Sequence, residues 1–269
     1  NERHNFEEEE HAVFLSGNGP LVAVLQEALA RDQAKNSEIT KTEALRKSKA
    51  FIQNIHFFRD EALDNQNPPI EKVVVFDEAQ RAWNLKQTAS FMKKKRGHDN
   101  FNQSEPEFLI SVLDRHDDWA VIICLIGGGQ EINVGEAGLP GWFTAIKNHY
   151  LNWHVYISPE ITDIEYTRGN ELGKLLSGIK YQSDKNLHLK TSMRSFRNKN
   201  VSEFVKEILD CKKDNATKLY SQLKENYPFV ITRNINTAKQ WIKNKARANE
   251  RFGLVASSNA KRLKPYGIF

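Results

Sequence analysis

Four short apolar runs, each closed by polar residues or glycine, constrain the fold of this chain more than any other feature. The runs are His11–Ser16, Val73–Phe76, Trp119–Ile126 and Trp153–Ser158. Segments with helical periodicity separate them, one beginning at Pro20 and a second spanning residues 41–64. Strands that are apolar on both faces and alternate with helices are typical of a parallel sheet covered on each side. The sequence therefore predicts an α/β fold whose polar residues gather at the carboxyl ends of the strands.

The character of the chain changes after about residue 165. Predicted basic helices alternate from there with short predicted strands: helices at 199–211, 213–224 and 235–248, strands near 186–190, 227–231 and 252–257. Residues 180–269 carry 20 Lys and Arg against 7 Asp and Glu, whereas residues 1–179 carry 19 against 27. This asymmetry indicates a polyanionic partner for the second half, although a solvated basic surface has the same composition. We expect two lobes, at 1–165 and 166–269.

The composition argues against several classes of protein. No stretch approaches the roughly 18 apolar residues of a membrane span, and the acidic start NERHNFEEEE has no apolar segment of a signal peptide. The eight histidines and the widely separated Cys124 and Cys211 show no zinc-site spacing. We therefore expect a protein of the reducing cytoplasm without membrane contact.

The apolar run at residues 73–76 ends in two adjacent carboxylates, within the sequence VVVFDEAQ. Burying two charges without a partner is costly, and a hydrated Mg²⁺ ion is an efficient partner. Asp77 would hold the ion while Glu78 orients and deprotonates a water, which is the Walker B arrangement of phosphoryl-transfer enzymes. The same sequence also fits a strand end that is acidic without a catalytic role.

Two further motifs carry polar groups suited to phosphate chemistry. Gly127, Gly128 and Gly129 permit close backbone approach after the third apolar run, and Gln130 then offers an amide that can sense a γ-phosphate or orient water. Arg194, in the sequence TSMRSFR, would bring a guanidinium from the second lobe to stabilise phosphoryl transfer. The alternatives are a flexible glycine turn and an arginine that contacts a surface phosphate, a nucleic acid or a carboxylate.

In combination these motifs resemble the helicase core of superfamily 1, and more narrowly the Schlafen group 3-like DNA/RNA helicase domain family. The resemblance covers most of the chain. It is carried by FLSGNGPL (14–21), VFDEAQRAW (75–83), CLIGGGQEI (124–132), GEAGL (135–139), LVASS (254–258) and the pair Arg262-Leu263. It implies an ATP- and Mg²⁺-dependent motor with a parallel-sheet, RecA-like core in two lobes, acting on single-stranded DNA or RNA.

The resemblance also implies roles for individual residues. Asp77 would bind Mg²⁺, and Glu78 would be the catalytic base. Gln130 would sense the γ-phosphate, and Arg194 would reach that phosphate from the second lobe. The remaining assignments are nucleotide contacts by Gln80, Gly128 and Gly129, and nucleic-acid contacts by Ser16, Asn18 and Arg197.

One element of the family pattern is missing from the sequence. A strand, a glycine-rich loop ending in Gly-Lys-Thr or Gly-Lys-Ser, and a helix should precede the first motif, but the nearest match, GNELGK at 169–174, has the wrong spacing and position. We therefore expect both lobes to be incomplete and the segment alone to be inactive. Because the phosphate-loop strand lies next to the third-motif strand in such cores, the run at 153–158 should be separated from the main sheet, or the sheet rearranged.

Other classes of function remain open. The sequence also fits a non-catalytic module that binds nucleic acid or a protein partner, and a regulatory ATPase domain of a defence or restriction system. Phe91 with the basic run Lys93–Arg96 would suit a strand-contacting loop, and equally a solvated loop.

Overall fold

The computed structural model describes residues 12–127, 135–162, 164–167, 169–189, 200–225, 227, 229–256 and 260–266. The chain forms two compact units, residues 1–189 and 190–269. Each is described by itself below.

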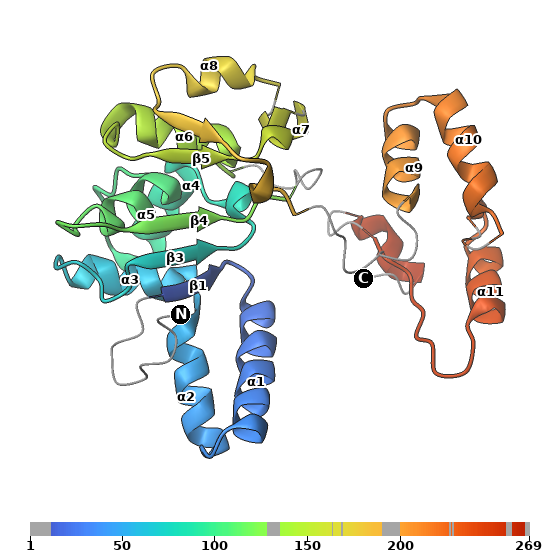
Figure 1. Cartoon of the computed structure of the whole chain (residues 1–269). Helices are drawn as coiled ribbons and strands as arrows, with labels where there is room; N and C mark the ends of the chain where they lie inside the picture. Colours follow the sequence, from blue (N-terminus) through green and yellow to red (C-terminus); the bar gives the residue numbers. More distant parts are fainter. Residues whose placement is uncertain are drawn as a thin grey trace. The chain divides into compact units, whose positions relative to one another are not determined.

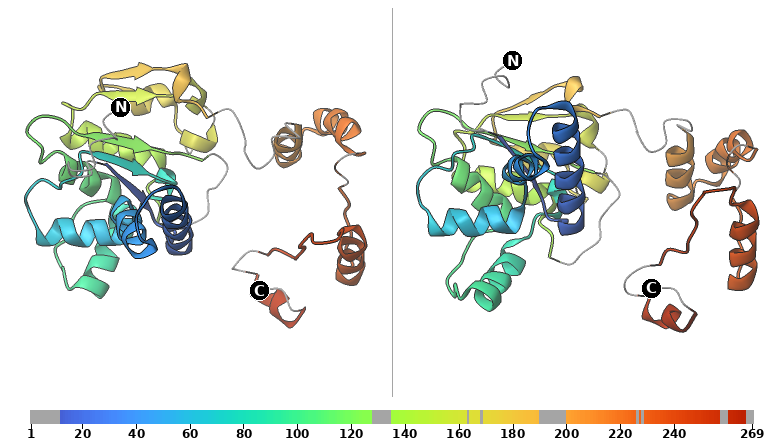
Figure 2. Two further views of the ribbon diagram at one scale, coloured as in Figure 1. Left: turned by 60° about the horizontal axis from the view of Figure 1, so that its bottom comes forward. Right: turned by 90° about the horizontal axis from the view of Figure 1, so that it is seen from below.

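The first unit is built on a four-stranded parallel sheet (Figure 1, Figure 2). Its strands are β1 (Ala12–Ser16), β2 (Ile52–Asn54), β3 (Val73–Phe76) and β4 (Val121–Cys124), in the order β2-β1-β3-β4. Leu15 lies in register with Phe76, and Phe76 with Cys124. The predicted α/β fold with a parallel sheet is therefore confirmed.

Eight helices accompany the strands in the described part of this unit. They are α1 (Gly19–Asn36), α2 (Lys41–Phe51), α3 (Ile55–Asp64), α4 (Leu85–Phe91), α5 (Glu105–Leu113), α6 (Gly138–His149), α7 (Ile164–Thr167) and α8 (Leu172–Leu176). Short 3-10 turns lie at η2 (Ala79–Arg81), η4 (Pro159–Thr162) and η5 (Lys185–Leu187), and a π-helical turn lies at η3 (Met92–Arg96). Figure 1 shows α1 and α2 as a hairpin that extends from the β1–β2 edge of the sheet.

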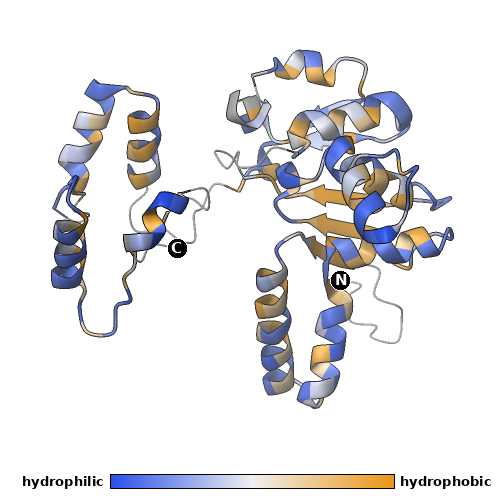
Figure 3. Ribbon diagram, turned by 180° about the vertical axis from the view of Figure 1, so that it is seen from behind, coloured by the Kyte–Doolittle hydropathy of each residue, from blue (hydrophilic) through white to orange (hydrophobic). Residues whose placement is uncertain are grey.

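The main core lies on one face of the sheet. Val13 pairs in register with Val74, and Val74 with Ile122, so these side chains share a face. They pack with apolar residues of α3, α5 and α6, including Phe58, Leu109 and Trp142. Figure 3 shows the apolar character of the strands.

The opposite face of the sheet is less well covered, contrary to the expectation of a sheet covered on each side. On β4, Val121 is 42% exposed and Ile123 is 43% exposed. Both are paired in register with residues of β3 that are only half buried. The apolar composition of β4 therefore does not correspond to burial in the described residues.

The predicted single helix at 41–64 is wrong. The structure has α2, then strand β2 at Ile52–Asn54, then α3. Ile52 pairs with Phe14 and Asn54 with Ser16, so hydrogen bonding to β1 replaces helical bonding at this point. The Asn54 side chain then accepts a hydrogen bond from the His56 N–H, which begins α3.

The fourth apolar run forms β5 (Val155–Ile157), which does not join the main sheet. It pairs in parallel with β6 (Tyr181–Ser183) instead. Ile157 packs with Leu176 and Ile179 in a second cluster, to which α6 contributes Leu139 and Phe143. The predicted separation of this strand from the main sheet is confirmed.

Because β6 and α8 pack against β5 and α6, residues 166–189 lie within the first compact unit. The division between the two units therefore comes later in the chain than the boundary at 165 and 166 that the sequence predicted.

The described part of the second unit is helical. It contains α9 (Asn200–Leu209), α10 (Lys213–Leu223), α11 (Ile235–Lys245) and the turn η6 (Lys261–Tyr266), which confirms the three predicted helices. The three predicted strands are wrong for their described residues, which form no strand. Ile231 and Val255 lie in two of these segments and are each 99% exposed, since no neighbouring strand covers them.

None of the described helices has the length and apolar character needed to cross a bilayer.

Candidate active site

Ser16 and Asp77 meet at the carboxyl ends of two adjacent strands. Ser16 closes β1, and the Asp77 N–H donates to the Leu15 carbonyl at 2.9 Å. Ser16 is 1% exposed, its hydroxyl accepts from the Asn18 N–H at 3.3 Å, and its side chain lies close enough to the Asp77 carboxylate to lower the pKa of that group. Burial and then the neighbouring charge of Glu78 raise the pKa of Asp77, while the Ser16 side chain opposes the rise. The positive charge around the Asp77 carboxylate therefore does not offset its burial and its repulsion by Glu78.

Glu78 adopts a left-handed backbone conformation directly after β3, with φ 53° and ψ 44°. This conformation costs a non-glycine residue about 1–2 kcal/mol, so the surrounding structure must impose it. The Glu78 carboxylate accepts a hydrogen bond from the Gln80 amide at 2.6 Å and lies 3.4 Å from the Arg81 Nε. Both partners come from the turn η2: Gln80 donates a hydrogen bond and Arg81 forms an ion pair, and together they constrain the direction of the carboxylate.

The Gln80 amide connects this acidic pair to the end of β4. Its Oε1 accepts from the Gly127 N–H at 3.2 Å while its Nε2 donates to Glu78. The Ala79 N–H donates to the Leu125 carbonyl at 2.9 Å, and the buried Trp142 indole donates to the Ala79 carbonyl at 2.9 Å. The DEAQ segment is thus fixed to β4 on one side and to α6 on the other.

The segment after DEAQ is also bonded to the residues that follow the third motif. The Asn84 N–H donates to the Gly135 carbonyl at 2.8 Å, and the Ala137 N–H donates to the Ala82 carbonyl at 2.6 Å. Trp83 and Glu136 form an antiparallel bridge between these two bonds. Residues 127 and 135–137, on either side of 128–134, are therefore both hydrogen-bonded to residues 80–84.

Comparison with known families identifies the fold that carries this site. The Schlafen group 3, DNA/RNA helicase domain matches residues 1–267. The chain belongs to this family. None of the curated proteins matches it. A Schlafen group 3 helicase domain is a helicase-like nucleic-acid motor domain, so the family agrees with an acidic pair at the carboxyl edge of a parallel sheet.

The structure brings together four of the residues predicted for the site of this helicase domain: Ser16, Asp77, Glu78 and Gln80. Of the six others, Asn18 is described, whereas Gly128, Gly129, Gln130, Arg194 and Arg197 lie outside the described residues. Their assignments remain predictions.

Two predicted nucleic-acid contacts have structural roles in the helicase domain. Ser16 is buried against Asp77, so its side chain serves the acidic pair. Asn18 is exposed, and its side chain accepts from the Leu21 N–H at 3.2 Å as the N-cap of α1. Sequence reasoning did not single out Arg81, whose signal was its position three residues after Glu78 in a tight turn.

The donor set at Asp77 fits Mg²⁺. No group of three or more His, Cys, Asp or Glu side chains suited to a metal occurs in the described residues. Asp77 and the Ser16 hydroxyl supply oxygen atoms only, and Mg²⁺ is usually held by one or two carboxylates together with waters and substrate phosphates. Asp77, whose pKa is raised by burial and by Glu78, would gain the cation that it lacks.

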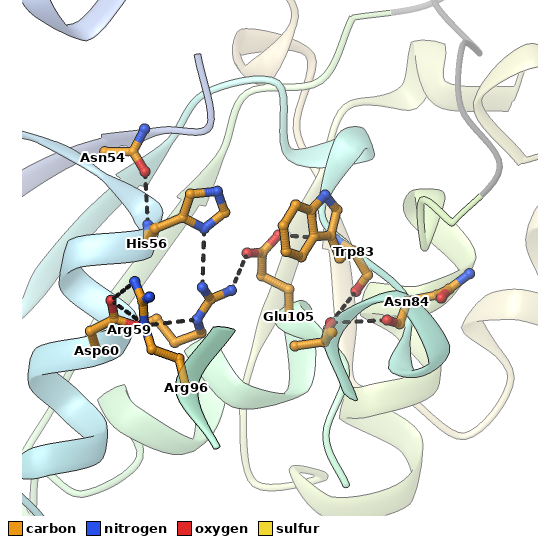
Figure 4. Close-up of polar contacts among 9 residues, drawn as sticks. Asn54, His56, Arg59, Asp60, Trp83, Asn84, Arg96 and Glu105 are labelled. Carbon is orange, nitrogen blue, oxygen red and sulfur yellow. Dashed lines mark hydrogen bonds and ion pairs between the residues drawn. The ribbon is translucent and has the colours of Figure 1, made fainter. Parts of the chain in front are cut away.

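A buried ion pair lies beneath the segment that follows DEAQ (Figure 4). Arg59 of α3 is 1% exposed, and its guanidinium lies 3.5 Å from Glu105, which is 4% exposed. Glu105 also accepts from the Trp83 N–H at 2.9 Å. The guanidinium lies 4.8 Å from the Phe91 ring centre and 3.2 Å from the His56 Nδ1. This network ties α3, α5 and the end of α4 to the segment after the acidic pair.

Proposed function

We propose that the chain is part of an ATP- and Mg²⁺-dependent motor that hydrolyses ATP while acting on single-stranded DNA or RNA. The observation that carries the proposal is the pair Asp77 and Glu78, with Ser16 on one carboxylate and Gln80 on the other. Adjacent carboxylates with fixed directions suit metal binding by one and proton transfer by the other.

The two carboxylates would have separate roles. Asp77, with the Ser16 hydroxyl, would hold Mg²⁺, which when bound neutralises charge on the transferred phosphate. Glu78 would accept the proton of the attacking water, and Gln80 and Arg81 would keep its carboxylate in place. Gln130 and Arg194 would complete the site at the γ-phosphate, as the family pattern implies.

ATP phosphates also need a binding loop, for which residues 1–269 contain no recognisable sequence. We infer that the edge of β4 is where a phosphate-binding strand, loop and helix would add. Two observations support this arrangement. The outer edge of β4 pairs with no described strand, since β5 pairs with β6. Val121 and Ile123 leave an apolar surface on β4 that a following helix would cover.

The proposal is tested by ATP hydrolysis with and without single-stranded oligonucleotides, in the intact protein that carries this domain. Glu78→Gln is expected to lower kcat by about 10²- to 10⁴-fold because it removes a general base. The exposed Glu160→Gln is the matched control and should leave kcat unchanged. Hydrolysis that survives Glu78→Gln would rule out the role assigned to Glu78.

ATP hydrolysis by the isolated 269-residue chain is a second test. We expect this chain to show no turnover. Turnover abolished by Glu78→Gln would mean that the chain holds ATP without a recognisable phosphate loop. Mg²⁺ should still raise the melting temperature of the wild-type chain more than that of Asp77→Asn, because a ligand that binds only the folded state stabilises it. An equal effect of Mg²⁺ on both proteins would contradict the metal site.

The basic second half favours one alternative, a nucleic-acid-binding module without catalysis. Residues 180–269 carry 20 Lys and Arg against 7 Asp and Glu. Salt-dependent binding of nucleic acid by the intact protein, with no hydrolysis and no effect of ATP, would support this alternative.

A further inference from the structure

The turn η3 presents four consecutive cationic side chains, Lys93 to Arg96, all exposed. We propose that this basic turn, with the exposed ring of Phe57 on α3, binds the phosphate backbone and a base of single-stranded nucleic acid. The inference rests on the proposed function, since it adds a binding surface for the nucleic acid on which the motor acts.

The basic turn is anchored at both ends. It is a π-helical turn, a rare form that often occurs at functional sites. Met92, at its start, is 0% exposed, and Gly97 ends it with φ 73°. The Arg96 Nε donates to Asp60 of α3 at 2.9 Å. Lysines on a fixed turn lose less conformational freedom on binding than lysines on a mobile loop.

A cluster formed by the rings of Phe91, His56 and Trp83 packs against the turn through Arg96. The Phe91 ring lies close to two guanidinium groups, 4.8 Å from Arg59 and 5.5 Å from Arg96. The same ring stacks on His56 with a centre distance of 5.4 Å and lies 5.2 Å from Trp83. The turn is therefore anchored to the first turns of α3 and, through Phe91, to the segment after DEAQ; Figure 4 shows the ion pair between Arg96 and Asp60 of α3.

The position of α3 places the turn beside the edge that carries the acidic pair. α3 begins directly after β2, and Asn54 at the end of β2 lies in register with Ser16 at the end of β1. His56 and Asp60, which contact Phe91 and Arg96, belong to the first two turns of α3. Nucleic acid bound at η3 would also affect Trp83, because the Trp83 ring contacts Phe91. Trp83 is in turn bridged to Glu136, which follows the third motif.

The charges and rings at this surface fit nucleic acid. Asp60 pairs with Arg96, and Asp99 pairs with Lys93 at 3.1 Å. Lys94 and Lys95 have no ion-pair partner among the described residues, so both are available for phosphates. Phe57, the neighbour of His56, is 72% exposed, and an exposed ring stacks on bases of any sequence.

The test is fluorescence anisotropy with single-stranded oligonucleotides at several salt concentrations, using the whole chain. Lys94→Gln/Lys95→Gln should lower affinity roughly 10-fold near 0.1 M salt and reduce the slope of log K against log salt by about 1.4, or about 0.7 per phosphate contact. Phe57→Ala should lower affinity about 5- to 100-fold without changing that slope. Lys35→Gln/Lys49→Gln, on the exposed surface of α1 and α2, is the matched control with the same change in charge.

The outcomes separate this inference from the proposed function. If the wild type binds and all variants behave like the control, the basic turn is not the binding surface, and the proposed motor stands. If the wild type binds no oligonucleotide even at low salt, the proposed action on nucleic acid is wrong, and this inference falls with it. Binding to anionic phosphatidylserine vesicles through Lys94, Lys95 and Phe57, without oligonucleotide binding, would overturn the inference in favour of a membrane surface.

Discussion

At the residue scale, the site depends on charged side chains whose partners are fixed by hydrogen bonds. Glu78 has a strained backbone, one hydrogen-bond donor and one ion-pair partner on its carboxylate, whereas Asp77 has the Ser16 side chain beside it and a raised pKa. The sequence identifies both carboxylates because they follow an apolar strand. The side chains that contact them come from a turn and from a neighbouring strand. The sequence predicted neither the role of Arg81 nor the burial of Ser16.

Arg59 offers a test of the network beneath the site. Arg59→Ala leaves the buried Glu105 without its guanidinium, and removing one partner of a buried pair typically costs about 3–5 kcal/mol. We expect urea denaturation at pH 7 to show a loss of this size. Glu105→Gln, which keeps an acceptor for the Trp83 N–H, should cost less.

The loss in Arg59→Ala should depend on pH. Burial raises the pKa of Glu105, and the Trp83 N–H and Arg59 oppose the rise. A raised carboxyl pKa means that ionisation opposes folding, so its cost appears as the pH rises through the folded-state pKa. Without Arg59 the pKa of Glu105 rises further, and the deficit should shrink as acid protonates Glu105. His56, whose pKa is lowered by burial and then by Arg59, would gain protons more readily in the variant. A deficit that is independent of pH would mean that lost packing, and not an unpaired charge, explains the variant.

At the element scale, short polar residues both end strands and begin helices. Asn18 follows β1 and caps α1, Asn54 ends β2 and caps α3, and Asn84 caps α4. Each helix start is therefore a local signal that the sequence contains. α5 begins with a capping box formed by Ser104 and Glu107.

Ser104 provides a prediction at this scale. The Ser104 side chain accepts from the Glu107 N–H at 3.3 Å at the start of the buried helix α5. Ser104→Ala should cost about 1 kcal/mol in urea denaturation, since the first turn of α5 loses its acceptor. Ser104→Asn restores an acceptor and should recover most of that stability. If the two variants are equally destabilised, the hydrogen bond at the cap is not the cause.

At the scale of the whole molecule, residues 1–189 contain both hydrophobic clusters and all the described strands. The second unit buries few large side chains, Phe204 and Leu223 among them. Stability should therefore reside mainly in the first unit, whereas the net positive charge lies in the second.

Two truncations test where the first unit ends. Residues 1–189 alone should show a cooperative thermal transition by circular dichroism. Residues 1–165 end at the boundary that the sequence predicted and lack β6, Leu176 and Ile179, so β5 loses its partner and the second cluster loses two members. Each lost side chain is worth about 1.5–3 kcal/mol. Equal melting temperatures for the two fragments would show that residues 166–189 do not belong to the first unit.

The sequence by itself determined the features that depend on local pattern. Apolar runs gave the strands β1, β3 and β4, capping residues gave helix starts, and the order of motifs gave the family and the acidic pair. These features depend on residues within a few positions of one another, where period and backbone chemistry act directly.

Only the tertiary structure decided the features that join distant residues. The break of the predicted helix by β2 depends on hydrogen bonds from β1, and β5 pairs with β6 in place of the main sheet. Arg59 and Glu105 are 46 residues apart, so no local sequence pattern predicts their pairing. Such contacts form only where the packed chain removes charges and backbone groups from water, because burial makes an unpaired polar group costly.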